Sequence, residues 1–153
     1  MAVTVELLLL RRDGAGLAYR RVSGPLTGSR HPDDVALEVV GQQAPGLLHS
    51  TSWRHTGDGL VLTYAALPDP EPQRTAQLIG SRVLAASDDP RRPSPAAIEI
   101  EQVAVHACRH LAWLARTDNV AQRVLDGEPA LRDAILHWAP APAGLLEAAF
   151  AAR

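Results

Sequence analysis

The stretch that decides the fold is residues 24–46, which read GPLTGSRHPDDVALEVVGQQAPG and predict a glycine-rich loop followed by a short helix. Pro32 suits the first turn of a helix, and the two acids behind it favour the positive end of the helix dipole. Apolar residues then follow at helical spacing: Val35, Ala36, Val39 and Val40. Gly41 and, further on, the pair Pro45–Gly46 predict the end of this helix.

Strand-like segments lie on both sides of the helix. Two of them precede it as a hairpin around a turn at residues 13–16, and two follow it around a turn at residues 56–59. We expect these four strands over residues 3–11, 17–22, 47–53 and 60–67. Residues 76–85 fit a strand or a helix, and Val83 and Leu84 favour a strand.

From residue 96 onward the pattern is helical. One apolar stripe recurs at three- and four-residue steps: Ile100, Val103, Ala104, Ala107, Leu111, Leu114 and Ala115. Residues 117–119 interrupt the stripe, and shorter helices are expected over residues 120–126, from Pro129 onward, and within residues 144–152. The fold class is therefore α+β, in one domain over residues 1–153. Its sheet and short helix would occupy residues 1–87, and a helical extension over residues 96–153 would pack on them.

The order of elements over residues 3–85 resembles that of the Nudix hydrolases. Their signature is Gly, five residues, Glu, seven residues, then Arg-Glu-apolar-x-Glu-Glu-x-Gly-apolar, and its register fits this chain without a gap. Gly24 and Val40 match the signature. The remaining positions differ. Arg30 stands where the signature has Glu, Glu38 where it has Arg, and Val39 where it has Glu. Gln42 and Gln43 replace the Glu pair, and Pro45 replaces the closing Gly. The resemblance implies a Nudix-like mixed sheet with a short box helix whose acids have been replaced.

These replacements affect the chemistry that the family performs. Nudix enzymes hold Mg²⁺ or Mn²⁺ against a diphosphate, and hard divalent ions prefer carboxylate oxygens. Val39 offers no ligand, and the amides of Gln42 and Gln43 offer weak ligands and no general base. We therefore expect no tight metal binding at the box, no ordinary Nudix hydrolysis and no assigned catalytic residue.

Arg30 and Glu38 look like the family's Glu and Arg exchanged. Either they pair, which would preserve the geometry between loop and helix with the charges reversed, or they are two unrelated exposed residues. An exposed pair contributes only about 0.2–1 kcal/mol.

An enzyme is the alternative interpretation. It would be a Nudix-type pyrophosphohydrolase that holds Mg²⁺ or Mn²⁺ with carboxylates from outside the box positions. Its carboxylates would have to converge near the glycine loop, and the candidates are Asp33, Asp34, Glu38, Glu99 and Glu101.

Two further groups of residues have site-like chemistry. Trp53, Arg54 and His55 are candidate ligand-binding residues, since an aromatic ring and a guanidinium can hold a base and a phosphate, although an ordinary surface role is the simpler interpretation. His106 and His110 lie four apart and share a helix face, which makes them candidate metal ligands. No third ligand is evident beside them, so structural histidines are the simpler interpretation.

Charge and hydropathy narrow the class of partner. The chain has a net charge of −2, and its 15 basic side chains are all arginine. Such a balance gives no bulk field that would attract nucleic acid or an anionic membrane. The pairs Arg11–Arg12, Arg20–Arg21 and Arg91–Arg92 are interpreted as solvated surface. The apolar run of the first strand is too short for a signal peptide or a membrane span, so we expect a cytoplasmic protein.

Two kinds of non-catalytic function fit these observations. The domain is expected to bind either a nucleotide-like small molecule or another protein. Three aromatic residues of the helical half, Trp113, Trp138 and Phe150, would either cover the sheet or form a homodimer interface.

Overall fold

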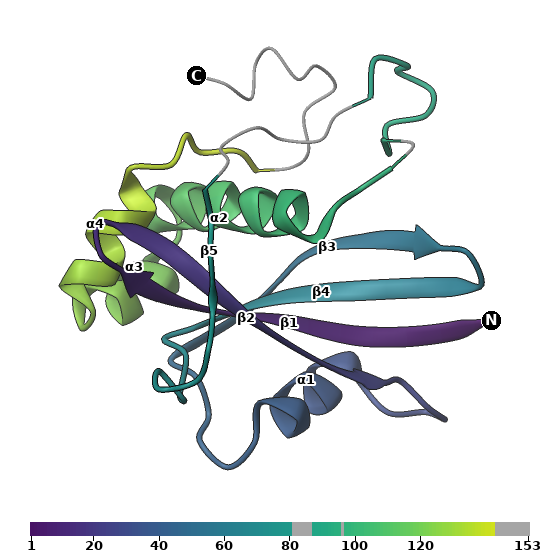
Figure 1. Ribbon diagram of the computed structural model, residues 1–153, viewed down its shortest axis with the longest axis horizontal. Coiled ribbons are helices and arrows are strands. Elements are labelled where there is room, and N and C mark those ends of the chain that lie inside the picture. Colours follow the sequence, from purple (N-terminus) through teal and green to yellow (C-terminus); the bar gives the residue numbers. More distant parts are fainter. Residues whose placement is uncertain (81–86, 96, 143–153) are drawn as a thin grey trace. The chain divides into compact units, whose positions relative to one another are not determined.

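The computed structural model describes residues 1–80, 87–95 and 97–142. Within these residues the chain forms a mixed five-stranded sheet and four helices, which confirms the α+β prediction (Figure 1). The strands are β1 (Ala2–Asp13), β2 (Gly16–Pro25), β3 (Leu47–Thr56), β4 (Gly59–Leu67) and β5 (Gln77–Leu78). The helices are α1 (Pro32–Val40), α2 (Ile100–Thr117), α3 (Asn119–Asp126) and α4 (Pro129–Leu136).

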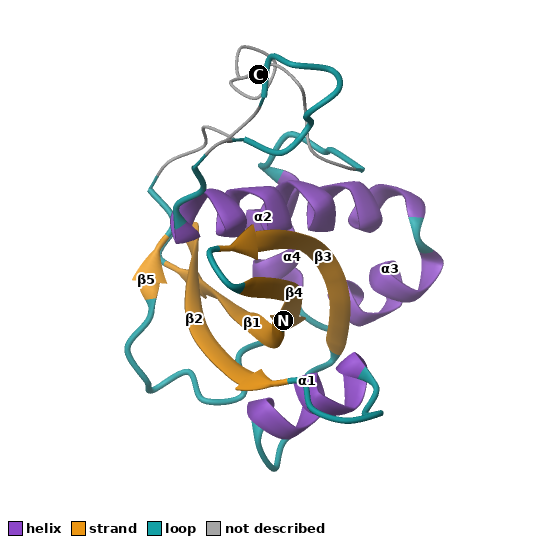
Figure 2. Ribbon diagram, turned by 90° about the vertical axis from the view of Figure 1, so that its right-hand side faces the viewer, coloured by secondary structure: helices purple, strands orange, loops and turns teal. Residues whose placement is uncertain are grey.

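The strands follow the order β3-β4-β1-β2-β5 across the sheet, shown in orange in Figure 2. Strand β1 pairs with β4 in parallel, with Glu6 opposite Thr63. Strand β3 pairs with β4 antiparallel, and an irregularity between Ser50 and Ser52 shifts their register. A parallel pair needs a long crossover connection, and here the chain between β1 and β4 contains β2, α1 and β3. Strand β3 is therefore left at one edge of the sheet.

The chain divides into two compact units. The first contains Met1–Arg11 and Ala18–Gln77, and the second contains Arg12–Leu17 and the described residues from Leu78 onward. In the second unit, helices α2, α3 and α4 contact one another around buried side chains such as Leu111, Leu125 and Ile135. The predicted break at residues 117–119 is confirmed, because Asp118 ends α2 and caps α3 by accepting a hydrogen bond from the Ala121 amide at 2.8 Å.

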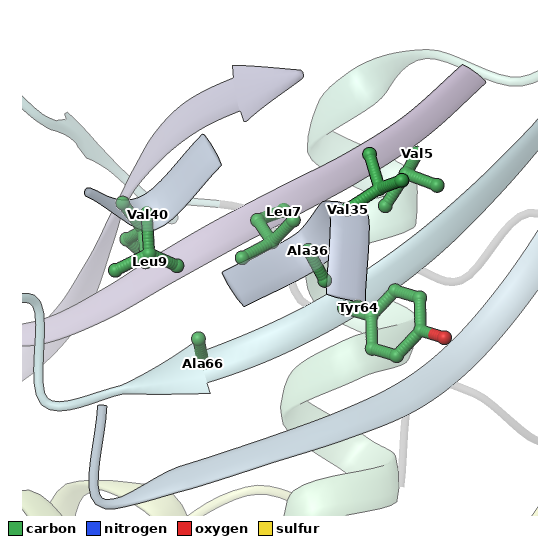
Figure 3. Close-up of a cluster of buried hydrophobic side chains, with 8 residues drawn as sticks. All are labelled: Val5, Leu7, Leu9, Val35, Ala36, Val40, Tyr64 and Ala66. Atoms are coloured by element: carbon green, nitrogen blue, oxygen red, sulfur yellow. The ribbon is translucent and has the colours of Figure 1, made fainter. Parts of the chain in front are cut away.

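One face of the sheet in the first unit carries helix α1. Figure 3 shows the apolar side of this helix over strands β1 and β4. The buried cluster consists of Val35, Ala36 and Val40 from α1, Val5, Leu7 and Leu9 from β1, and Tyr64 and Ala66 from β4. Burial of this stripe holds α1 in place, because a helix of nine residues is only marginally stable alone.

Only the first part of the strand predicted over residues 76–85 lies within the described residues. Within the described part of residues 76–85, only Gln77 and Leu78 are in strand conformation. Residues 81–86 lie outside the described residues, as does the final helical stretch predicted over 144–152. In the part of the chain that the structure describes, no helix combines the length and the apolar character needed to cross a bilayer.

Candidate functional site

The start of helix α1 is built from polar contacts that engage its first acid. His31 caps the helix, with its Nδ1 accepting a hydrogen bond from the Asp33 amide at 3.1 Å. The Tyr64 hydroxyl donates a hydrogen bond to the Asp33 carboxylate. Burial and, second, this contact with Asp33 raise the pKa of the Tyr64 phenol above its ordinary value. Asp33 therefore serves the junction between α1 and β4.

Two residues of the box register, Gly24 and Val39, pack directly against each other. A Cβ atom added to Gly24 would lie 2.7 Å from Cγ1 of Val39, which is too close for two carbon atoms. Val39 is partly buried and also packs against the apolar cluster of α1. At the position where the Nudix signature has a carboxylate, this chain therefore has an apolar packing residue. A side chain at position 24 would therefore force Val39 to shift.

The exchanged pair of the box register makes contact. A terminal nitrogen of Arg30 binds the carboxylate of Glu38, as the first of the two interpretations expects. The two side chains are 42% and 65% exposed, so the pair connects the loop to the helix at a contribution of about 0.2–1 kcal/mol. Gln42 and Gln43 follow the helix and are exposed.

Four of the five carboxylates proposed for a displaced metal site make other contacts, including those of Asp33 and Glu38 described above. In the second unit, Glu99 forms a capping box with Gln102 at the start of α2. Glu101 accepts a hydrogen bond from the Gly80 amide at 3.1 Å. Asp34 lies exposed in the first turn of α1. Among the described residues, no group of three or more His, Cys, Asp and Glu side chains is placed to hold a metal ion.

His106 and His110 stack on one face of α2, as their spacing predicts. Their ring centroids are 6.4 Å apart, and the ring planes differ by 21°. They belong to no group of three potential metal ligands within the described residues.

The segment Trp53–Arg54–His55 is divided between the two faces of the sheet. Neighbouring residues of a strand point to opposite sides, so Arg54 lies on the face opposite to Trp53 and His55. Trp53 is 63% exposed, whereas the Arg54 side chain is only 14% exposed. The structure therefore does not bring these three candidate residues together as one site.

Arg54 instead belongs to a buried network around Glu6, whose side chain is fully buried in β1. Oε1 of Glu6 accepts hydrogen bonds from Arg54 Nη1 at 2.8 Å and from the Thr63 hydroxyl at 3.0 Å. Oε2 accepts from Arg54 Nη2 at 2.9 Å and from Arg21 Nε at 2.5 Å. Arg54 Nη1 also donates to the Thr63 oxygen at 3.1 Å, which closes the network. We call Glu6, Arg21, Arg54 and Thr63 the Glu6 cluster.

The charge of Glu6 is stabilised by its two arginines. Burial alone raises the pKa of a carboxyl group, because it disfavours the charged form. Hydrogen bonds and charges from Arg54 and Arg21 outweigh that effect and hold the pKa of Glu6 below its ordinary value. The cluster contains two guanidinium groups and one carboxylate, so it carries an excess of one positive charge.

Comparisons with protein-family models, with curated proteins and with solved structures find no match for this chain.

A second buried carboxylate, Asp69, fixes the connector that follows β4. It accepts hydrogen bonds from Arg20 Nη2 at 2.8 Å and Nε at 3.1 Å, and from the Glu71 amide at 3.0 Å. Arg11 lies 3.6 Å away. Burial raises the pKa of Asp69, but Arg20 and the other partners reverse the effect and lower it. The solvated-surface interpretation of the pairs Arg11–Arg12 and Arg20–Arg21 is thus wrong for Arg20 and Arg11, whose side chains are only 11% and 19% exposed.

Glu6 and Asp69 were missed as functional candidates in the sequence. Glu6 is the one charged residue within the run Val3–Leu10, which the pattern identifies as a buried strand. A charge in such a run needs a partner, because burying an isolated carboxylate is very costly. That signal marks Glu6 but does not identify its partners, which lie up to 57 residues away.

Proposed function

We propose that this chain is a Nudix-like module that binds a nucleotide-like small molecule and does not hydrolyse it. The observation that supports the proposal is the set of contacts made by the residues that align with the Nudix signature. Val39 packs against Gly24, and Glu38 pairs with Arg30. The loop and the helix thus keep a structural role, because Val39 packs where the signature has Glu and Arg30 pairs with Glu38. Gln42 and Gln43, which stand at the Glu pair of the signature, are exposed.

The contacts of the acids also bear on the alternative, a hydrolase with displaced metal ligands. That enzyme needs two or more carboxylates within reach of one ion. Asp33 is held by Tyr64, and Glu101 by the Gly80 amide. These contacts favour binding over metal-assisted hydrolysis.

The test is a ligand panel read by thermal unfolding. Nucleoside diphosphates and triphosphates, nucleotide sugars and dinucleotides would each be added with EDTA, with Mg²⁺ or with Mn²⁺. A ligand at about 100 times its dissociation constant adds roughly 2.7 kcal/mol of stability. For a chain of this length, that corresponds to a rise in Tm of roughly 5–10 °C.

The proposal expects a shift in EDTA and no product, with product release followed by ion-exchange chromatography of each sample. A shift that requires Mg²⁺ or Mn²⁺ and is followed by hydrolysis would overturn the proposal in favour of the enzyme. The absence of any shift across the panel would also overturn it, and would favour the second candidate function.

That second candidate is a protein-interaction module, and the edge strand β3 favours it. The strand spans ten residues at one end of the sheet and presents Trp53 at 63% exposure. Exposed edge strands pair with strands of partner chains, and exposed tryptophans anchor interfaces. A dissociation constant for self-association, measured by sedimentation in the wild type and in Trp53→Ala, tests whether the partner is a second copy of this chain.

A further inference from the structure

The Glu6 cluster places a charged group where an apolar residue would serve the fold at least as well. Its neighbours along β1, Val5 and Leu7, are fully buried apolar residues. Buried ion pairs rarely stabilise a protein more than well-packed apolar side chains of the same size. Packing alone therefore does not account for Glu6, and the residues that it orients supply a reason for it.

Glu6 orients its two arginines differently. Arg54 directs both terminal nitrogens at the carboxylate and is only 14% exposed, so it is held firmly. Arg21 donates through Nε, and its side chain is 49% exposed. Among the described residues, none accepts a hydrogen bond from Nη1 or Nη2 of Arg21. The outer end of Arg21 thus presents its remaining donors while its inner end is fixed.

The charge of the cluster selects the class of ligand. Two guanidinium groups against one carboxylate leave an excess of one positive charge. A guanidinium whose terminal nitrogens are available binds phosphate oxygens in a planar, two-pronged arrangement that an ammonium group cannot match. Orientation by a buried partner reduces the conformational entropy that the arginine loses when the ligand binds.

We propose that Nη1 and Nη2 of Arg21 bind a phosphate group of a small anionic ligand, with Arg54 adding charge and Glu6 acting as the positioning residue. The inference rests on the proposed binding function and assigns it a site. It places the phosphate on the face of the sheet opposite to α1, away from the box helix, and requires no metal ion.

The experiment measures binding of inorganic pyrophosphate by calorimetry, in EDTA and at fixed ionic strength. Wild type is compared with Arg21→Gln, Arg21→Lys and the matched control Arg12→Gln, which removes the same charge from another exposed arginine. The proposal expects Arg21→Gln to weaken binding at least about tenfold, and Arg21→Lys to weaken it less. Arg12→Gln should leave binding within about twofold of wild type.

A fourth variant tests the role of Glu6. Glu6→Gln keeps the size of the side chain and should weaken pyrophosphate binding, because the guanidinium of Arg21 is then no longer oriented. For the same reason, arginine and lysine at position 21 should differ less in their affinity for pyrophosphate than they do when Glu6 is present. The affinity of the double variant Glu6→Gln/Arg21→Lys for pyrophosphate, compared with that of Glu6→Gln, measures this difference. If Glu6→Gln does not fold, the comparison of Arg21→Gln, Arg21→Lys and Arg12→Gln still decides the site.

The outcomes separate this site from the proposed function. If wild type binds pyrophosphate and Arg21→Gln binds it equally well, the site is wrong while the binding function stands. If wild type binds no pyrophosphate up to millimolar concentration, the site is wrong as well, and the function is judged by the nucleotide panel. Tighter binding of a nucleoside diphosphate than of pyrophosphate, lost in Arg21→Gln, would support the site and identify the phosphate as part of a nucleotide.

Discussion

The Arg54→Met variant tests whether the Glu6 cluster is a buried ionic network. Methionine fills a similar volume but removes both hydrogen bonds that Arg54 donates to the carboxylate, at 2.8 and 2.9 Å. Removing one partner of a buried ion pair costs about 3–5 kcal/mol, since it leaves a buried charge uncompensated. Arg21 still donates to Glu6, so we expect a loss at the lower end, about 3 kcal/mol. Urea denaturation at pH 7, followed by circular dichroism, measures it.

The pH dependence gives an independent measure of the same contact. In wild type the arginines lower the pKa of Glu6, so its contribution to stability is present above the ordinary value of 4.5 and is lost as the pH falls through the lowered pKa. In Arg54→Met the effect of burial dominates and the pKa of Glu6 rises. Protonation then relieves the variant, so the difference in unfolding free energy between variant and wild type should start to narrow above pH 4.5, at the raised pKa of the variant. It should narrow further as the pH falls through the lowered pKa of wild type.

The matched control is Arg30→Met, which breaks the exposed pair with Glu38. Its cost should stay within about 1 kcal/mol, because both side chains are largely hydrated. Equal losses in the two variants, or a difference for Arg54→Met that does not change with pH, would refute the argument that Glu6 is buried among charges.

Three further predictions test other contacts. Gly24→Ala should lower the free energy of unfolding by about 1–3 kcal/mol in urea denaturation, because the added methyl group meets Val39. The control Gly57→Ala, where the added methyl group has open space, should be nearly neutral, and equal losses would contradict the close approach of α1. Asp69→Asn should lower the free energy of unfolding by about 2 kcal/mol or more in thermal unfolding at pH 7, and the difference from wild type should shrink below pH 3.8 because the pKa of Asp69 is lowered. A neutral effect at pH 7 would contradict the role of Asp69 as a buried ion-pair partner. The phenol of Tyr64 should ionise above its ordinary pKa of 10 in an ultraviolet titration, and Tyr64→Phe should remove that late step and lower the free energy of unfolding by about 0.5–1.5 kcal/mol. A wild-type titration without a late step would count against the contact between Tyr64 and Asp33 at the start of α1.

The elements that local pattern governs could be predicted from the sequence. The boundaries of α1 follow from Pro32 at its start and Gly41, which has a φ of 104°, at its end. A contact between Arg30 and Glu38 was one of two interpretations that the sequence left open, and the structure decides it in favour of the pair. Of the strand predicted over residues 76–85, the described part forms β5 at Gln77 and Leu78, next to β2 in the sheet.

The sequence by itself determined the α+β class and the loop and short helix of residues 24–41, because periodicity and residue type are local properties. The tertiary structure decided which distant residues meet. Strand order brings Arg54 to Glu6 across 48 residues and Arg20 to Asp69 across 49, and no local pattern encodes that order. Arginines that look like solvated surface in the sequence therefore became the partners of buried acids, since a buried carboxylate needs hydrogen bonds and opposite charge wherever the fold can supply them.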